Sequence, residues 1–208
     1  MSDPVSVIEF LHIIEKLKVL SNVISIRVAP QRTKRTGWLN YGVQGPESVS
    51  DHMHRMGVMA MVIDDKDLDI NNSCALMPDK LYADLALYIG DITPHQNVSK
   101  EEKYKLERDT MEYFCSQLGE TPQSCEIRDL WQEYEDVSSS EAKLVKDLDK
   151  FEMILQALEY EKADGKRLDE FFDSTRGRFV HPTVKAWVEV VYKERRELWE
   201  SKSAEVIV

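Results

Sequence analysis

Two side chains that can bind a metal ion stand at apolar positions of predicted helices. His52 lies on the apolar face of the helix predicted over 48–63, and Asp149 lies beside the apolar stripe of a later helix. Neutral imidazole is the commonest metal ligand in proteins. A carboxylate in such a setting must be paired or must coordinate a cation, because unpaired burial is costly. The alternatives are a core histidine with one hydrogen bond, and an Asp149 that pairs with Lys146 or Lys150.

Two further carboxylates occur in the stretch "ADLALYIGDITP". Asp84 falls inside a predicted helix, and Asp91 follows Gly90, where that helix should end. Asp91 also suits a turn or cap, which is a frequent role for aspartate. Asp79 follows Pro78 and is better placed to start the helix than to bind a ligand.

The segment "KRTGW" combines cations with an aromatic ring. The guanidinium of Arg35 suits phosphate recognition, and the indole of Trp38 offers a surface for a base or a sugar. The alternative is a surface cation, with Trp38 anchoring the loop to the core. Bundle proteins build metal sites from side chains on facing helices, and these residues fit that plan.

Length and charge limit the possible functions. The chain has 208 residues, is 42% hydrophobic and carries a net charge of −11, which predicts one globular domain over 1–208. The negative charge argues against binding to a nucleic-acid polymer, which requires a basic surface. A small phosphate ligand is still compatible, because a bound metal ion can invert the local field.

Cysteine usage and the N-terminal residues bear on the compartment. Cys74, Cys115 and Cys125 form no CxxC pair, so we expect reduced thiols in a cytoplasmic protein, with the nucleus as a second compartment. Residues 1–20 mix charged residues into an apolar run. That pattern predicts an amphipathic helix, not a signal peptide or a membrane span.

Helical periodicity dominates the chain and predicts an all-α bundle. The predicted helices are 3–17, 48–63, 80–89, 99–118, 125–137, 138–160 and 182–202. Capping boxes are predicted at Ser48 with Asp51 and at Ser99 with Glu102, and Ser138 should begin the helix that follows it. The segment 22–47 is a long connection that includes one strand candidate, 23–28. The metal and nucleotide site is expected within about 32–155.

The order of several motifs resembles the HD-domain 5'-deoxynucleotidase family, in particular its HD domain-containing protein 2 group. The motifs are "RTGW", "GPESVSDHMHRMGVMAMVI", "GDITP", "SKEEK", "WQEYE", "SSEAKLVKDLDKFEMILQALEYE" and "FFDSTRGRFVHP". The resemblance implies an all-α HD-domain helical bundle that forms homodimers. It also implies a phosphohydrolase that depends on a divalent cation (Mn²⁺, Co²⁺ or Mg²⁺) and removes phosphate from deoxynucleoside 5'-monophosphates.

The same resemblance implies roles for individual residues. His52, Asp84 and Asp149 match three ligands of the first metal. Asp91 and the main-chain oxygen of Ile92 match a second metal site. Asp91 is also the candidate that could take part in proton transfer.

Two positions depart from the family pattern. The family's "HDLAE" reads "ADLAL" here, so Ala83 replaces the histidine of the His-Asp pair and Leu87 replaces a carboxylate. A rival alignment places Asp79 on the pair, and it lacks the histidine as well. Arg35 and Trp38 fall in the loop that contacts the nucleotide. The function expected is therefore a 5'-deoxynucleotidase, with two alternatives: a catalytically impaired pseudoenzyme that binds a nucleotide or a partner, and a helical protein without a ligand.

Overall fold

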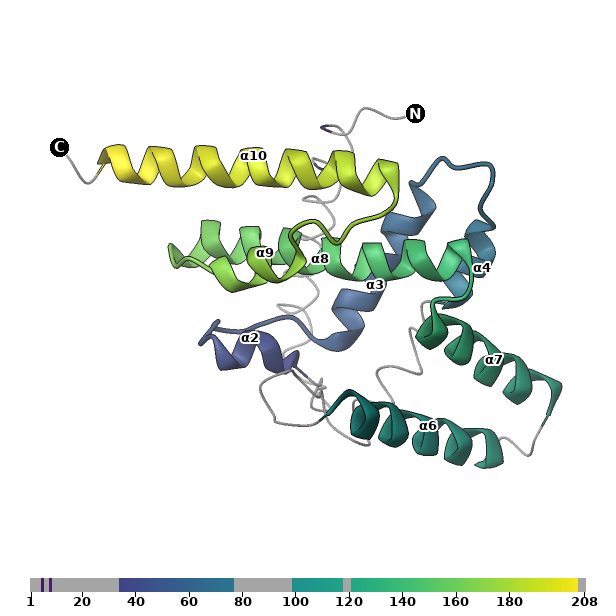
Figure 1. Cartoon of the computed structure of the whole chain (residues 1–208). Helices are drawn as coiled ribbons and strands as arrows, with labels where there is room; N and C mark the ends of the chain where they lie inside the picture. Colours follow the sequence, from purple (N-terminus) through teal and green to yellow (C-terminus); the bar gives the residue numbers. More distant parts are fainter. Residues whose placement is uncertain (1–4, 6–7, 9–33, 77–98, 118–120, 206–208) are drawn as a thin grey trace, which may run out of the picture.

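The computed structural model describes residues 5, 8, 34–76, 99–117 and 121–205 (Figure 1). The helices are α2 (Thr36–Asn40), α3 (Val49–Met61), α4 (Ile70–Leu76), α6 (Lys100–Gln117), α7 (Pro122–Asp136), α8 (Ser140–Asp164), α9 (Asp169–Thr175) and α10 (Pro182–Glu205). Within these ranges β-structure is limited to one isolated bridge between Lys34 and Ser48. The all-α prediction is confirmed.

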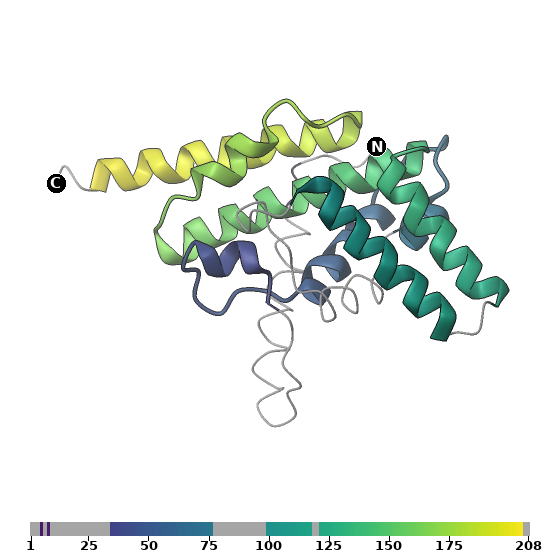
Figure 2. The same cartoon turned by 60° about the horizontal axis from the view of Figure 1, so that its bottom comes forward.

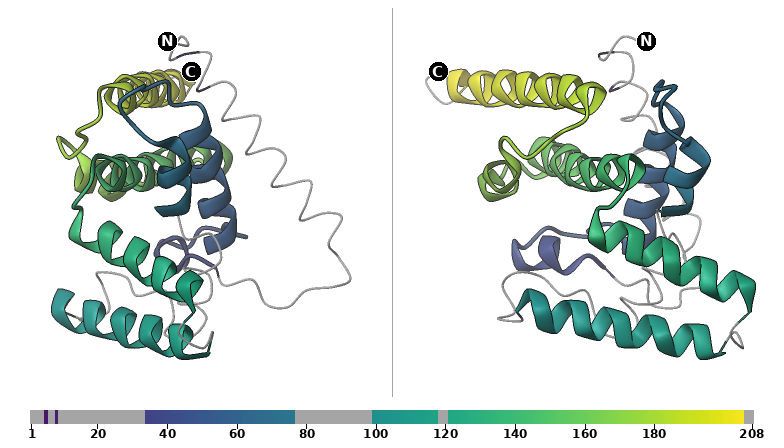
Figure 3. Two further views of the ribbon diagram at one scale, coloured as in Figure 1. Left: turned by 90° about the vertical axis from the view of Figure 1, so that its right-hand side faces the viewer. Right: turned by 45° about the vertical axis from the view of Figure 1, so that its right-hand side comes forward.

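Helix α8 is the centre of the arrangement. It contacts α3, α4, α7, α9 and α10. In Figures 1 and 3, α10 lies along one side of α8 and the α6–α7 pair lies beyond the other side. Helix α3 crosses α8 between them, so side chains on one face of α3 point at α8.

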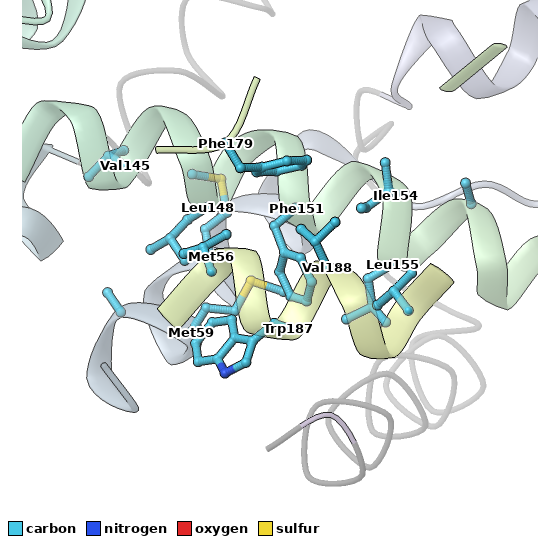
Figure 4. Packing of buried hydrophobic residues seen from close by; sticks show 14 of the residues in the cluster. Met56, Met59, Val145, Leu148, Phe151, Ile154, Leu155, Phe179, Trp187 and Val188 are labelled. Carbon is cyan, nitrogen blue, oxygen red and sulfur yellow. The ribbon is translucent and has the colours of Figure 1, made fainter. Parts of the chain in front are cut away.

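The stripe predicted for α8 forms the main core. Its buried members are Leu144, Leu148, Phe151, Leu155 and Leu158. Figure 4 shows Leu148, Phe151 and Leu155 of this stripe packed against Met56 and Met59 of α3 and against Trp187 and Val188 of α10. The rings of Phe151 and Trp187 have centroids 5.4 Å apart, which joins α8 to α10 through a large apolar contact.

The ends of α8 differ from the prediction. The N-cap is Ser139, whose side chain accepts a hydrogen bond from the Ala142 N–H at 3.0 Å. Ser138, the predicted start, lies one residue before this N-cap and two before the first helical residue, Ser140. The helix continues past Tyr160 to Asp164, because Gly165 is the residue that takes the left-handed conformation (φ 67°) ending it.

Both predicted capping boxes are confirmed. Ser48 accepts from the Asp51 N–H at 3.2 Å and its own N–H donates to the Asp51 carboxylate at 2.9 Å. Ser99 and Glu102 make the same reciprocal pair at 3.0 and 3.1 Å. The short helices α2, α4 and α9 were not predicted. The predicted elements 3–17, 23–28 and 80–89 lie outside the described residues.

Helices α6 and α7 have a small apolar cluster of their own. Met111, Cys115 and Trp131 are buried together, with Tyr104 and Ile127 packed on them. Figure 2 shows the two helices side by side. None of the helices that the structure describes is long and apolar enough to cross a membrane.

A buried carboxylate at the end of α8 holds α10 in place. Glu161 accepts hydrogen bonds from Arg195 Nε and from the Trp199 indole, each at 2.8 Å. It also accepts from the Leu168 N–H at 2.6 Å. The sequence analysis did not identify this residue, because its partners are separated from it by up to 38 positions.

Replacing Glu161 with glutamine should destabilise the fold. The change leaves the partly buried Arg195 guanidinium with the half-exposed Asp169 as its remaining carboxylate, which costs about 3 kcal/mol. For a chain of this size the melting temperature should fall by about 6–12 °C. Differential scanning calorimetry measures this change, and an unaltered melting temperature would contradict the assignment.

The Glu161 contacts should also make stability depend on acid pH. Burial raises the pKa of Glu161, but the hydrogen bonds from Arg195, Leu168 and Trp199 outweigh it and lower the pKa below its ordinary value of 4.5. This contribution is present above pH 4.5 and is lost as the pH falls through the lowered pKa. Urea titrations between pH 5 and 3 should show a steeper loss of stability in the wild type than in Glu161→Gln. Equal slopes would contradict the prediction.

Candidate metal centre

His52 and Asp149 meet across the α3–α8 contact. His52 is 5% exposed, and its Nε2 lies 2.9 Å from Asp149 Oδ1. The Asp149 side chain is 39% exposed, so the pair stands at the edge of the core with one side open. The sequence analysis proposed these two residues as metal ligands, and the structure brings them together.

The alternative partners of Asp149 are engaged elsewhere. Lys146 binds Glu135 at 3.1 Å, and Lys150 binds Asp147 at 2.9 Å. His52 is likewise more than a core histidine with one hydrogen bond, since both of its ring nitrogens contact carboxylates.

The separation of the two donor atoms suits a shared cation. Two ligand atoms that each lie about 2.1 Å from a metal ion, at a right angle, are about 3.0 Å apart. Burial and the Arg35 charge lower the pKa of His52, but its contacts with Glu152 and Asp149 outweigh them and raise it. Burial raises the pKa of Asp149, but His52 outweighs it and leaves the pKa lowered. Two carboxylates around one imidazole therefore favour a positive charge at this place.

Glu152 contacts the other nitrogen of His52. Its Oε2 meets His52 Nδ1, and its Oε1 accepts from Arg55 Nε at 3.0 Å and from Arg55 NH2 at 2.9 Å. Both Glu152 and Arg55 are completely buried. Their positions follow from helical spacing, because Glu152 is one turn after Asp149 and Arg55 is one turn after His52.

Arg55 is held by further residues along α8. Its NH1 donates to Glu159 at 2.7 Å and its NH2 donates to Gln156 at 3.1 Å. Burial lowers the pKa of Arg55, but Glu159 and Glu152 outweigh it and raise the pKa well above its ordinary value. Arg55 is therefore a permanent buried cation between α3 and α8.

The loop before α3 brings a second arginine to the same place. Arg35 NH1 lies 3.0 Å from Glu47 Oε1, 3.3 Å from Glu152 Oε2 and 3.1 Å from His52 Nδ1. The Arg35 N–H donates to the Glu47 carbonyl at 3.2 Å, which fixes the loop. The main-chain N–H of Glu47 donates to Tyr160 Oη at 2.9 Å.

Glu47, His52 and Glu152 could by distance hold a cation, since one ligand atom from each lies within 4.8 Å of the others. Arg35 NH1 stands among these three groups, so a guanidinium already supplies the positive charge there. The open side, between His52 Nε2 and Asp149, is the better place for a metal ion.

Trp38 is buried and not exposed to solvent. It is 1% exposed, stacks on Phe171 at 4.3 Å and meets Tyr160 edge-on at 5.2 Å. Its indole donates to Glu47 Oε1 at 3.2 Å. This placement matches the alternative in which Trp38 anchors the loop, and its contact with a nucleotide stays a prediction.

Several predicted site residues lie outside the described part of the chain. They are Asp84, Asp91 and Ile92, together with Asp79, Ala83 and Leu87. Three residues of the observed cluster were missed: Glu47, Arg55 and Glu152. For Arg55 and Glu152 the available signal was a charge at a core-facing helical position, three residues after His52 and after Asp149, whereas Glu47 lies in the loop before α3.

The sequence model of the HD domain matches residues 30–190. This chain belongs to the HD-domain family. HD domains are metal-dependent, and the described part of this HD-domain protein includes donor groups close enough to hold a cation.

Comparison with curated relatives shows to which group of the HD-domain family the chain is similar. The HD-domain protein is 46% identical over 191 residues to 5'-deoxynucleotidase HDDC2 of Dictyostelium discoideum, covering 86% of this chain and 93% of that one. It is 44% identical over 193 residues to 5'-deoxynucleotidase HDDC2 of Homo sapiens, covering 91% and 86%. The PH0347 protein of Pyrococcus horikoshii has a similar structure, with TM-score 0.63 and 29% identity, covering 79% of this chain and 92% of that one. Membership of the HD-domain 5'-deoxynucleotidase family is thereby confirmed.

Replacing Arg55 with methionine should destabilise the protein by about 3–5 kcal/mol, because it removes one partner of a buried ion pair. Arg55→Lys keeps the charge and should cost less, although it loses the fork of parallel hydrogen bonds. Urea denaturation measures both variants.

The matched control is Arg176→Met, which removes an ion pair with Asp173 that is 72% and 65% exposed at its two side chains. An exposed pair contributes at most about 1 kcal/mol. An Arg55→Met variant no less stable than Arg176→Met would show that the buried network does not hold α3 to α8.

Proposed function

We propose that this chain is a metal-dependent phosphohydrolase of the 5'-deoxynucleotidase type, which hydrolyses deoxynucleoside 5'-monophosphates to deoxynucleoside and phosphate. The observation that carries the proposal is the approach of His52 Nε2 to Asp149 Oδ1 at 2.9 Å, at the open edge of the core. The names of relatives that are 40–48% identical over most of the chain support the same activity.

The proposed cofactor is a divalent cation, Mn²⁺, Co²⁺ or Mg²⁺. His52 and Asp149 would hold it together with Asp84, and Asp91 with the main-chain oxygen of Ile92 would serve a second ion. Such an ion polarises a phosphoryl group and lowers the pKa of bound water. The parts played by Asp84, Asp91 and Ile92 are supported by the family resemblance.

Arg35 is the proposed phosphate-binding residue. NH1 is occupied by Glu47 and Glu152, whereas Nε and NH2 make no side-chain hydrogen bond within the described ranges. Burial lowers the pKa of Arg35, but the Glu47 and Glu152 charges outweigh it and raise the pKa. A fixed cation next to the metal ligands can stabilise the charge that develops on the phosphoryl oxygens.

Proton transfer to the departing 5'-oxygen is assigned to Asp91, because Leu87 cannot serve as an acid. A positioned acid or base contributes about 100–10,000-fold to the rate. The indole of Trp38 keeps Glu47 in place for Arg35, and any direct contact with the nucleotide is part of the proposal. We also propose that the protein forms a homodimer in the cytoplasm and does not act on a nucleic-acid polymer.

The sequence also favours a second candidate function. Ala83 and Leu87 replace a family metal ligand and a family carboxylate, so a pseudoenzyme that binds the nucleotide without turnover is the alternative. Only the first candidate releases phosphate, whereas the pseudoenzyme binds a nucleotide or a partner without turnover.

Replacing Asp149 with asparagine should abolish phosphate release. Asparagine keeps the shape but removes the charge, so the loss should be at least about 100-fold, no milder than the loss of an outer partner of a metal ligand. The protein is loaded with Mn²⁺, and inorganic phosphate is measured with a panel of deoxynucleoside and ribonucleoside 5'-monophosphates.

The matched control is Asp173→Asn, which removes an exposed carboxylate of α9 that pairs with Arg176. The Asp173→Asn variant should keep wild-type activity. If the wild type releases no more phosphate than Asp149→Asn, the nucleotidase proposal fails and the pseudoenzyme is the favoured function.

A further inference from the structure

We infer that Glu152 is a positioning residue that fixes His52 as a metal ligand and Arg35 as a phosphate-binding residue at the same time. The inference rests on the proposed function. It adds a residue that does not touch the metal or the substrate, and that acts through two side chains that do.

The two oxygens of Glu152 face four N–H groups. Oε2 meets His52 Nδ1 and Arg35 NH1, and Oε1 meets Arg55 Nε and NH2. The three guanidinium nitrogens can only donate to the carboxylate, because a guanidinium has no acceptor, and His52 Nδ1 donates to it in the tautomer that we infer. Only a carboxylate, which accepts at both oxygens, can satisfy both sides of this arrangement.

The contact with Glu152 fixes the tautomer of His52. With a cation bound at Nε2, the hydrogen on Nδ1 would be donated to Glu152 Oε2, and the Nε2 lone pair would face the cation that His52 shares with Asp149. In the metal-free protein a hydrogen on Nε2 donates to Asp149 Oδ1 at 2.9 Å. A histidine that binds a metal usually donates its other N–H to a carboxylate or a carbonyl, which sets the ring orientation. Arg35 NH1 lies 3.1 Å from the same Nδ1, and its two hydrogens are used by Glu47 and Glu152.

Arg55 fixes the position of Glu152 by binding the carboxylate oxygen that does not contact His52. Arg55 binds Oε1 through two nitrogens and is anchored by Gln156 and Glu159, one and two turns further along α8. Glu152 therefore cannot rotate away from His52 without breaking the Arg55 contacts. This chain has Ala83 where its family has a second histidine ligand, so the orientation of the remaining imidazole matters more here.

The test is the Glu152→Gln substitution, which preserves shape and size. If the amide oxygen faces Arg55, the NH₂ group faces Nδ1 and Arg35, which favours the wrong tautomer. If the oxygen faces Nδ1, the NH₂ group faces the Arg55 donors. Affinity for Mn²⁺, measured from the electron paramagnetic resonance signal of the free ion, should fall about 10–100-fold.

The matched control is Glu161→Gln. Glu161 is equally buried on α8 and also binds an arginine, but it contacts Leu168, Arg195 and Trp199 at the C-terminal end of the helix. It should lower the melting temperature and keep wild-type Mn²⁺ affinity. A folded Glu152→Gln protein with unchanged affinity would overturn the inference.

A second measurement does not require a stable variant. Nitrogen-15 NMR of histidine in the Zn²⁺-loaded wild type reports which ring nitrogen of His52 carries the hydrogen, with His52→Asn giving the assignment. We expect the hydrogen on Nδ1, and a hydrogen on Nε2 would overturn the inference. If the wild type binds Mn²⁺ and carries the hydrogen on His52 Nδ1 but releases no phosphate, the proposed function is wrong and the inferred role of Glu152 stands.

Discussion

The site depends on one buried carboxylate that is surrounded by donors. Glu152 sits at the crossing of α3 and α8, where it joins the imidazole of His52 to two guanidinium groups. A charge in the interior is tolerated only when it is paired and hydrogen-bonded. Because both oxygens of Glu152 are used, the carboxylate locks the relative positions of a metal-ligand candidate, a phosphate-binding candidate and the core of the bundle.

Helix α8 can carry this network because its polar and apolar residues occupy different sides. Leu148, Phe151 and Leu155 enter the main core, while Asp149, Glu152, Gln156 and Glu159 follow one another at helical spacing toward α3 and the Arg35 loop. The same helix therefore supplies packing energy and functional groups. Long helices with such a division give a site more rigidity than a loop would provide.

Local sequence signals identified much of the scaffold. Serine caps predicted α3 and α6 because capping residues and the amides they satisfy are close in sequence. The final helix begins at Pro182 as predicted, since proline is tolerated in a first turn. The pairing of His52 with Asp149 was foreseen only as a resemblance, because the two residues are 97 positions apart.

The parts that escaped prediction have non-local causes. Helices α2 and α9 are short and face each other through Trp38 and Phe171, so their stability comes from contacts across the chain and not from their own periodicity. Glu152 and Arg55 look like solvated charges in a sequence, because charged residues are rarely buried unless they are paired. Their partners, at separations of 97 and more, cannot be read from local patterns.

The separate cluster of Met111, Cys115 and Trp131 has a consequence for how the molecule opens. Cooperative units with few links to the main core exchange their amide hydrogens through partial unfolding, at a lower free energy than global unfolding. Among the described helices α6 contacts α7, so we expect that it can detach as such a unit while α3, α8 and α10 stay folded. We therefore expect local unfolding of α6 to leave the contact between His52 and Asp149 intact.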